Sequence, residues 1–227
     1  MRKTFLFSFF LTWCLYSAEV SSLWDLARSA LKEKNYVSAR ILLQEILDTD
    51  PYGEYADKAS YFLALTFFYQ EDYEAARDAI EIFLRDFPES SYYADGLYWQ
   101  AQTYFKLKKS KKALRLFEKF IEKYPKHRKT PYALLSLGIL YEKHKRLEKA
   151  LEAYHTILDK FANSDPAKEA LIKLGELYYK QKNFSMALKY FQKARKQATN
   201  NNEAVFAMLR IMRSYFELKE YGEALSY

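Results

Sequence analysis

A repeat of 37 residues constrains this chain more than any other feature. Alanine opens the pattern Ala-x-x-x-(aromatic or aliphatic) at Ala39, Ala76, Ala113, Ala150, Ala187 and Ala224. A second column with the same period holds Leu26, Leu63, Gln100, Leu137, Leu174 and Ile211. A fixed period of this size predicts a solenoid, in which each unit buries its apolar face only against its neighbours.

Each unit has the pattern of a helical hairpin. Apolar residues recur within it at spacings of three and four, which places them on one helical face. Pro51, Pro88 and Pro125 close successive units, because proline cannot continue a helix. The 227 residues include only 5 glycines, too few for the many tight turns of β-sandwiches or α/β folds. The sequence therefore predicts an all-helical protein.

Two segments identify a resemblance to a known repeat family. Leu137-Gly138-Ile139-Leu140-Tyr141 and Leu174-Gly175-Glu176-Leu177-Tyr178 resemble the first helix of the tetratricopeptide repeat (TPR). The resemblance covers residues 19–227 and implies an all-α, right-handed solenoid of five antiparallel hairpins and a partial sixth. The expected units are about 20–56, 57–93, 94–130, 131–167, 168–204 and 205–227, each full one three residues longer than the common unit of 34.

The N-terminus resembles a secretory signal peptide of residues 1–18. Arg2 and Lys3 precede an uncharged apolar run from Thr4 to Tyr16 that is too short for an ordinary transmembrane helix. We therefore expect export and a periplasmic or outer-membrane-associated location. Around Cys14 the sequence also resembles a degenerate lipobox, so Cys14 is either lipidated or removed with the signal. In the second case the mature chain has no cysteine, which excludes disulfides.

The segments between hairpins indicate a particular group within the TPR family. The stretch from Phe87-Pro88 to Ala94, together with a signal sequence, resembles bacterial envelope members. Two such members are the BamD-like outer-membrane assembly lipoproteins and the Tol–Pal periplasmic coordinator. The resemblance implies a non-enzymatic scaffold for outer-membrane protein assembly. The alternatives are a coordinator linked to Tol–Pal and the cell wall, or a cytoplasmic TPR adaptor if the N-terminus is misread.

No pattern in the chain predicts catalysis. His127, His144 and His155 have no second histidine at metal-ligand spacing, and there is no glycine-rich phosphate loop. Glutamate and aspartate are abundant, but on amphipathic helices they are most often solvated. We expect no catalytic residue, no metal and no cofactor.

The first helices carry the candidate partner-binding groove, because in TPR proteins they line the concave surface. Two columns fall there by alignment, and they are apolar at eleven of twelve positions. The first is Trp24, Tyr61, Tyr98, Leu135, Ile172 and Leu209, and the second is Leu31, Phe68, Phe105, Glu142, Tyr179 and Phe216. Trp24, Tyr61, Phe68, Tyr98, Phe105, Leu135 and Tyr179 are thus predicted to bind protein or peptide segments. The alternative is that they form ordinary solenoid core.

Charge is segregated along the chain. Residues 19–105 have 7 basic against 16 acidic side chains, a net charge of −9, whereas residues 106–149 have 15 against 4, a net charge of +11. The second block forms a basic edge at two hairpin turns: Lys108, Lys109, Lys111, Lys112, Lys143, Lys145 and Arg146. It favours an anionic envelope partner, with a solvated edge as the alternative. Export argues against nucleic acid.

The sixth unit has its first helix at about Glu203–Leu218 and then breaks off at Tyr227, a few residues into the second helix. Apolar residues spread around much of this helix, among them Val205, Phe206, Leu209 and Phe216. Solenoids normally end with a polar capping surface. We expect either a truncated form of a longer protein, or an uncapped end that docks on a partner or a second copy.

Overall fold

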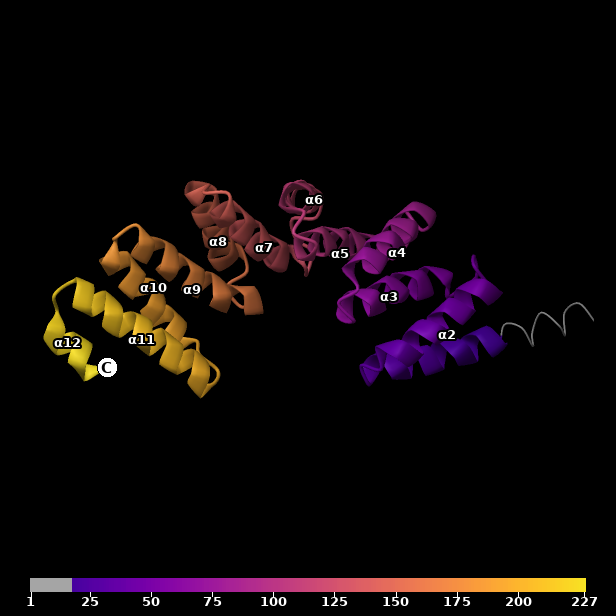
Figure 1. Ribbon diagram of the computed structural model, residues 1–227, viewed down its shortest axis with the longest axis horizontal. Helices are drawn as coiled ribbons and strands as arrows, with labels where there is room; N and C mark the ends of the chain where they lie inside the picture. Colours follow the sequence, from indigo (N-terminus) through magenta and orange to yellow (C-terminus); the bar gives the residue numbers. More distant parts are fainter. Residues whose placement is uncertain (1–17) are drawn as a thin grey trace, which may run out of the picture. The chain divides into compact units, whose positions relative to one another are not determined.

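A computed structural model describes residues 18–227, and every described element is helical (Figure 1). The chain divides into two compact units, one ending at Leu116 and the other beginning at Phe117. Antiparallel helical hairpins fill both units, so the predicted all-α solenoid fold is confirmed.

The first unit opens with a helix over residues 18–32. It continues through α2 (Tyr36–Thr49), α3 (Ala56–Tyr69), α4 (Tyr73–Asp86) and α5 (Tyr93–Lys106). Helix α3 packs on both α2 and α4, and α4 packs on α5. Helix α6 (Ser110–Lys123) crosses the division between the units.

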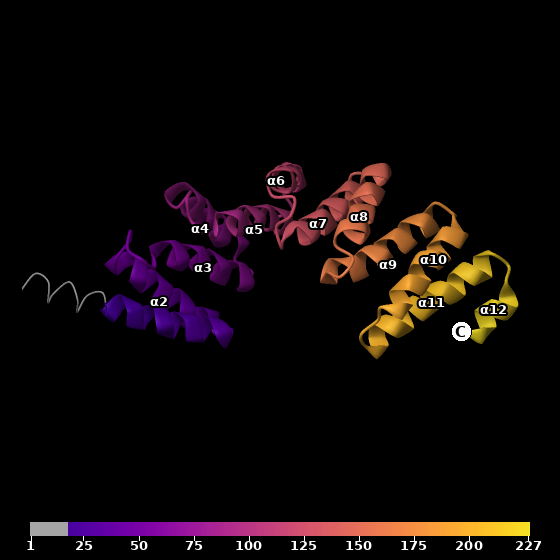
Figure 2. The same cartoon turned by 180° about the vertical axis from the view of Figure 1, so that it is seen from behind.

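The second unit continues the pattern with α7 (Thr130–Lys143), α8 (Leu147–Lys160), α9 (Asp165–Lys180) and α10 (Phe184–Lys196). It closes with α11 (Asn201–Glu217) and the short α12 (Tyr221–Ser226). Helix α10 packs against both α9 and α11, and the three lie side by side in both views of the molecule (Figures 1 and 2).

A left-handed residue makes the turn inside every hairpin. The described residues other than glycine with positive φ are Lys34, Glu71, Lys108, Lys145, Lys182 and Lys219, each 37 residues after the last. The next N–H bonds back to the carbonyl five residues earlier, as Arg146 does to Tyr141 at 2.8 Å. This is the Schellman ending of a helix, whose left-handed position is usually glycine.

The residue after the left-handed one is the N-cap of the second helix. Asn35, Asp72 and Asn183 stand at this position and accept a hydrogen bond from the backbone N–H three residues on. Each therefore caps the second helix while its own N–H closes the first. One residue thus serves two helix ends, which keeps the turn short without glycine.

Glycine serves helix contact elsewhere. A Cβ at Gly138 would overlap the ring of Tyr154, and one at Gly175 would lie 2.5 Å from a ring carbon of Phe191. Both rings are buried in the core. Glycine at these positions lets the first helix approach an aromatic ring on the second.

Hydrogen bonds from a tyrosine column link successive hairpins, and we call these bonds the tyrosine ladder. Tyr104 donates to Glu81 at 2.6 Å and Tyr141 donates to Glu118 at 2.7 Å. Tyr178 bonds His155 and Tyr215 accepts from Gln192, both at 3.3 Å. Every rung joins a first helix to the second helix of the preceding hairpin, 23 residues earlier.

Candidate functional site

Two of the predicted groove residues lie in the core. Tyr61 is 3% exposed and Tyr98 is 5% exposed. The Tyr61 ring stacks on Tyr92 at 4.7 Å and packs against Phe83 at 5.5 Å. For these two tyrosines the alternative interpretation as solenoid core holds, because their rings are already covered by neighbouring helices.

The other predicted groove residues are partly exposed. Trp24, Phe68, Phe105, Leu135 and Tyr179 all have intermediate exposure. The Trp24 ring stacks on Tyr55 at 5.7 Å, and the Phe68 ring meets Trp99 edge-on at 4.8 Å. Each offers a partner only part of its side chain.

The one polar member of these columns has a structural explanation. Glu142 Oε1 accepts a hydrogen bond of 2.7 Å from the hydroxyl of the fully buried Tyr154, and Oε2 lies 3.4 Å from Lys180 Nζ. Burial and this carboxylate raise the pKa of Tyr154 far above its usual value. Glu142 therefore satisfies a buried hydroxyl rather than marking a break in a binding surface.

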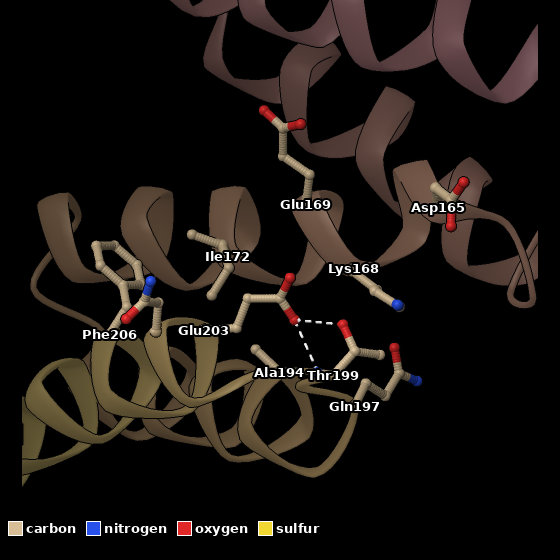
Figure 3. Close-up of a pocket in the computed structure, with 10 residues that line it drawn as sticks. Asp165, Lys168, Glu169, Ile172, Ala194, Gln197, Thr199, Glu203 and Phe206 are labelled. Carbon is tan, nitrogen blue, oxygen red and sulfur yellow. Dashed lines mark hydrogen bonds between the residues drawn. The ribbon is translucent and has the colours of Figure 1, made fainter.

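A pocket of about 690 Å³ lies between α9, α10 and α11, and we call it the α9–α11 pocket (Figure 3). Its lining residues are Asp165, Lys168, Glu169, Ile172, Ala194, Gln197, Thr199, Asn202, Glu203 and Phe206. Ile172 belongs to the first groove column, so one position of that column lines this pocket.

The start of α11 fixes one wall of this pocket. Asn200 caps the helix by accepting from Glu203 N at 2.9 Å, and Glu203 reaches back to Thr199 N at 2.8 Å. The dashed lines in Figure 3 show the Glu203 carboxylate turned to Thr199. These hydrogen bonds from Thr199, backbone first, lower the pKa of Glu203, so it is charged at neutral pH.

The pocket combines an apolar floor with an acidic rim. Ile172 on α9 and Phe206 on α11 supply apolar surface, and Arg210 holds one side of the Phe206 ring at 4.9 Å. Asp165, Glu169 and Glu203 outnumber the single basic lining residue, Lys168. Such a surface suits a segment that carries an apolar and a cationic side chain. The sequence columns identified Ile172 but not the acidic rim, because the rim comes from helix starts outside the columns.

The predicted basic edge is partly neutralised. Lys109 Nζ lies 3.7 Å from Glu74, and Lys112 Nζ lies 3.7 Å from Glu81 while also donating to Tyr104. Lys108 and Lys145 occupy the left-handed turn position, and Lys111, Lys143 and Arg146 are exposed. Binding of an anionic partner by this edge stays a prediction.

Apolar side chains gather at α11 and α12. Leu209, Phe216, Tyr221 and Leu225 are all more than half exposed, and α12 has no buried residue. They line a pocket of about 450 Å³ together with Met212, Arg213 and Ala224. The structure thus leaves these apolar side chains of α11 and α12 exposed.

Within 18–227 no group of His, Cys, Asp and Glu could hold a metal ion. His155 instead bonds Tyr178 and packs its ring 5.8 Å from Tyr190. No helix in the same range is both long and apolar enough to span a membrane. Cys14, the candidate lipidation site, lies outside the described residues.

Three protein-family models match the chain. The outer membrane lipoprotein family YfiO matches residues 17–110, and two tetratricopeptide repeat families match residues 95–127 and 135–203. The YfiO match begins after Cys14 and ends in the third hairpin. No curated protein sequence matches the chain significantly.

Solved structures share the fold at low identity. A tetratricopeptide repeat protein from Parabacteroides merdae is 17% identical with a TM-score of 0.69, over 91% of this chain and 76% of its own. PilF from Pseudomonas aeruginosa is 16% identical with a TM-score of 0.73, over 93% and 89%. MamA from Desulfovibrio magneticus is 19% identical with a TM-score of 0.66, over 79% and 97%.

Proposed function

Because the chain is a tetratricopeptide repeat protein of the YfiO-like type, we propose that it is a non-enzymatic scaffold of the bacterial cell envelope, acting in outer-membrane protein assembly. The match of residues 17–110 to an outer membrane lipoprotein family is the observation that carries the proposal. The basic start and apolar run at the N-terminus agree with export.

The scaffold would bind partner segments through the α9–α11 pocket. An apolar side chain of the partner fits between Ile172 and Phe206, while a neighbouring lysine or arginine meets the acidic rim. Phe206 stands on the first helix of its hairpin, so a segment lying in the pocket runs across α9 and α11. The partly exposed Trp24, Phe68, Phe105, Leu135 and Tyr179 would extend the binding surface along the chain.

Photocrosslinking at Phe206 in the native cell tests this function. A photoreactive residue at 206 is expected to crosslink to unfolded outer-membrane proteins or to subunits that assemble them. The matched control carries the same residue at Ile82, which is exposed on α4 and outside the pocket. Phe206→Ala should lower outer-membrane protein levels while Ile82→Ala should not. Normal levels in the Phe206→Ala strain, with no crosslink at 206, would contradict the proposal.

Lipidation of Cys14 would hold the scaffold at the membrane. We expect wild-type protein to take up labelled palmitate and sediment with membranes, and Cys14→Ala to lose both properties. A mature N-terminus at Glu19 would show instead that Cys14 leaves with the signal. A mature cytosolic protein that starts at Met1 would contradict export altogether.

The basic edge would meet an anionic envelope component, and salt distinguishes this from a solvated edge. Lys108→Glu with Lys111→Glu should weaken binding to vesicles containing anionic lipid, and rising salt should weaken binding by the wild type. Lys119→Glu with Lys123→Glu on α6 is the matched charge control. Salt-independent binding, or equal loss in the control, would remove the proposal.

A further inference from the structure

The first hairpin carries an apolar patch at positions that are polar in the next four hairpins. Val37 and Ile41 lie on α2, one turn apart, and are 53% and 60% exposed. The equivalents of Val37 are Glu74, Lys111, Glu148 and Ser185, and those of Ile41 are Asp78, Arg115, Glu152 and Lys189. The solenoid therefore needs no apolar residue at either position, and packing does not explain this pair.

The same patch lies where the tyrosine ladder has no rung. The ladder positions between the first two hairpins hold Phe67 and Gln44, and phenylalanine has no hydroxyl. Gln44 Nε2 donates instead to Asp48 Oδ1 at 2.8 Å. A pocket of about 570 Å³ opens beside this junction, lined by α2 and by Phe67 of α3.

The rim of this pocket is acidic. Glu45 and Asp48 line it and are at least partly exposed, while Arg40, its one basic residue, packs over the Phe67 ring at 5.5 Å. The surrounding residues 19–105 carry a net charge of −9. The potential around the pocket is therefore negative, which attracts a cationic partner and disfavours an anionic one.

We propose that Val37, Ile41 and Phe67 with the rim of Glu45 and Asp48, a set that we call the α2 patch, bind an amphipathic cationic helix of a partner protein. Val37 and Ile41 would pack against its apolar face, since residues four apart on a helix share one side. Lysine or arginine beside that face would meet the rim. This second site is separate from the α9–α11 pocket and does not depend on the role proposed for it.

A designed peptide tests the proposal. The probe is an 18-residue helix with leucine at positions i, i+3, i+4 and i+7 and lysine elsewhere, labelled for fluorescence anisotropy. Val37→Glu with Ile41→Asp installs the residues that the second hairpin carries there, so the fold should persist. We expect this double variant to weaken binding by about tenfold or more. Glu148→Val with Glu152→Ile on α8 is the matched control, which adds an apolar pair elsewhere.

Three results would overturn the proposal. The first is equal binding by wild type and the double variant with unchanged circular dichroism. The second is equal binding of the same helix with glutamate in place of lysine, because the acidic rim must discriminate against it. The third is that the double variant still binds the peptide but has lost a different property of the wild type. That property would be self-association, measured by sedimentation, or binding to lipid vesicles. The patch would then serve a second copy or a membrane. A negative result in the Phe206 experiments would contradict the proposed role of the α9–α11 pocket but would leave the proposal for the α2 patch unaffected. The two proposals therefore fail separately.

Discussion

At the scale of single residues, the chain makes its hairpin turns without glycine. Five lysines and one glutamate adopt the left-handed conformation at the same position of every unit. For a residue with a Cβ this conformation costs about 1–3 kcal/mol, which the Schellman hydrogen bonds and the packed hairpin must offset. The low glycine content thus reflects tolerated strain rather than an absence of tight turns.

Lys145→Gly should raise the free energy of unfolding by about 1 kcal/mol, because glycine adopts this φ without steric cost. Urea denaturation of the purified variant and wild type measures this difference in the free energy of unfolding. Lys149→Gly is the control, since Lys149 lies inside α8 and glycine there should cost about 1 kcal/mol. Destabilisation by both variants would show that the Lys145 side chain contributes more than its backbone strain costs.

Gly138→Ala should lower the free energy of unfolding by about 1–3 kcal/mol. The new methyl group would overlap the buried Tyr154 ring, which cannot move without disturbing the core. Gly222→Ala on α12 is the control, because a Cβ there meets nothing within 4 Å. Equal unfolding midpoints for Gly138→Ala and the wild type would contradict the close approach of helix and ring.

At the scale of helices, the sequence predicted the hairpins but not the bonds between them. The prediction that proline closes each unit is accurate at Pro51 and Pro88, which stand two residues after the ends of α2 and α4. Helix α8 ends at the same repeat position with Ala162 in place of proline. The C-cap N–H of α8 donates to the carbonyl of Ile157, as the C-cap N–H groups of α2 and α4 donate to the carbonyl four residues earlier. Backbone capping therefore sets where the helix ends, and proline only reinforces it.

The tyrosine ladder should couple neighbouring hairpins measurably. Tyr141→Phe removes the donor to Glu118, and Glu118→Ala removes the acceptor. A double-mutant cycle by urea denaturation is expected to give a coupling of about 1 kcal/mol, since the acceptor is charged and the pair half-buried. Phe67 and Gln44 form the natural control pair, and the cycle of Phe67→Ala and Gln44→Ala should show a smaller coupling. A coupling near zero for Tyr141 and Glu118 would mean that water replaces the rung.

At the scale of the whole molecule, the repeat made the fold predictable, while the exposure of the candidate binding residues was harder to predict. Periodicity indicates which residues face other helices. Tyr61 and Ile172 share one column, yet Tyr61 is buried while Ile172 lines the α9–α11 pocket. Whether a residue of this column is covered depends on the size of its neighbours, which for Tyr61 are Phe83 and Tyr92. A column alignment does not show which side chains will be neighbours or how large they are. The acidic rim of the α9–α11 pocket likewise comes from loop and capping geometry.

Alkaline pH should destabilise the whole fold. Burial and nearby carboxylates raise the pKa of Tyr104 and Tyr141, while burial and Tyr178 raise that of Tyr190. Tyrosines of the unfolded chain titrate near pH 10, so above that pH the unfolded state loses protons first and stability falls. Urea midpoints should be flat from pH 7 to about pH 9.5 and decline above it. Tyr154→Phe should decline less steeply, and a profile that stays flat to about pH 11 would show that these buried tyrosines do not govern alkaline stability.

Because the two residues of each rung in the tyrosine ladder are always 23 positions apart, one hairpin could replace another and still form a rung with its neighbour. Removing residues 119–155, one full period, would place Tyr178 at that same offset after Glu118, so a carboxylate would again face the hydroxyl. Gene duplication or deletion in steps of 37 residues would therefore lengthen or shorten the molecule without a new junction having to evolve. The first hairpin departs from this uniformity, because Phe67 stands at its junction with the second hairpin and apolar residues are exposed on α2.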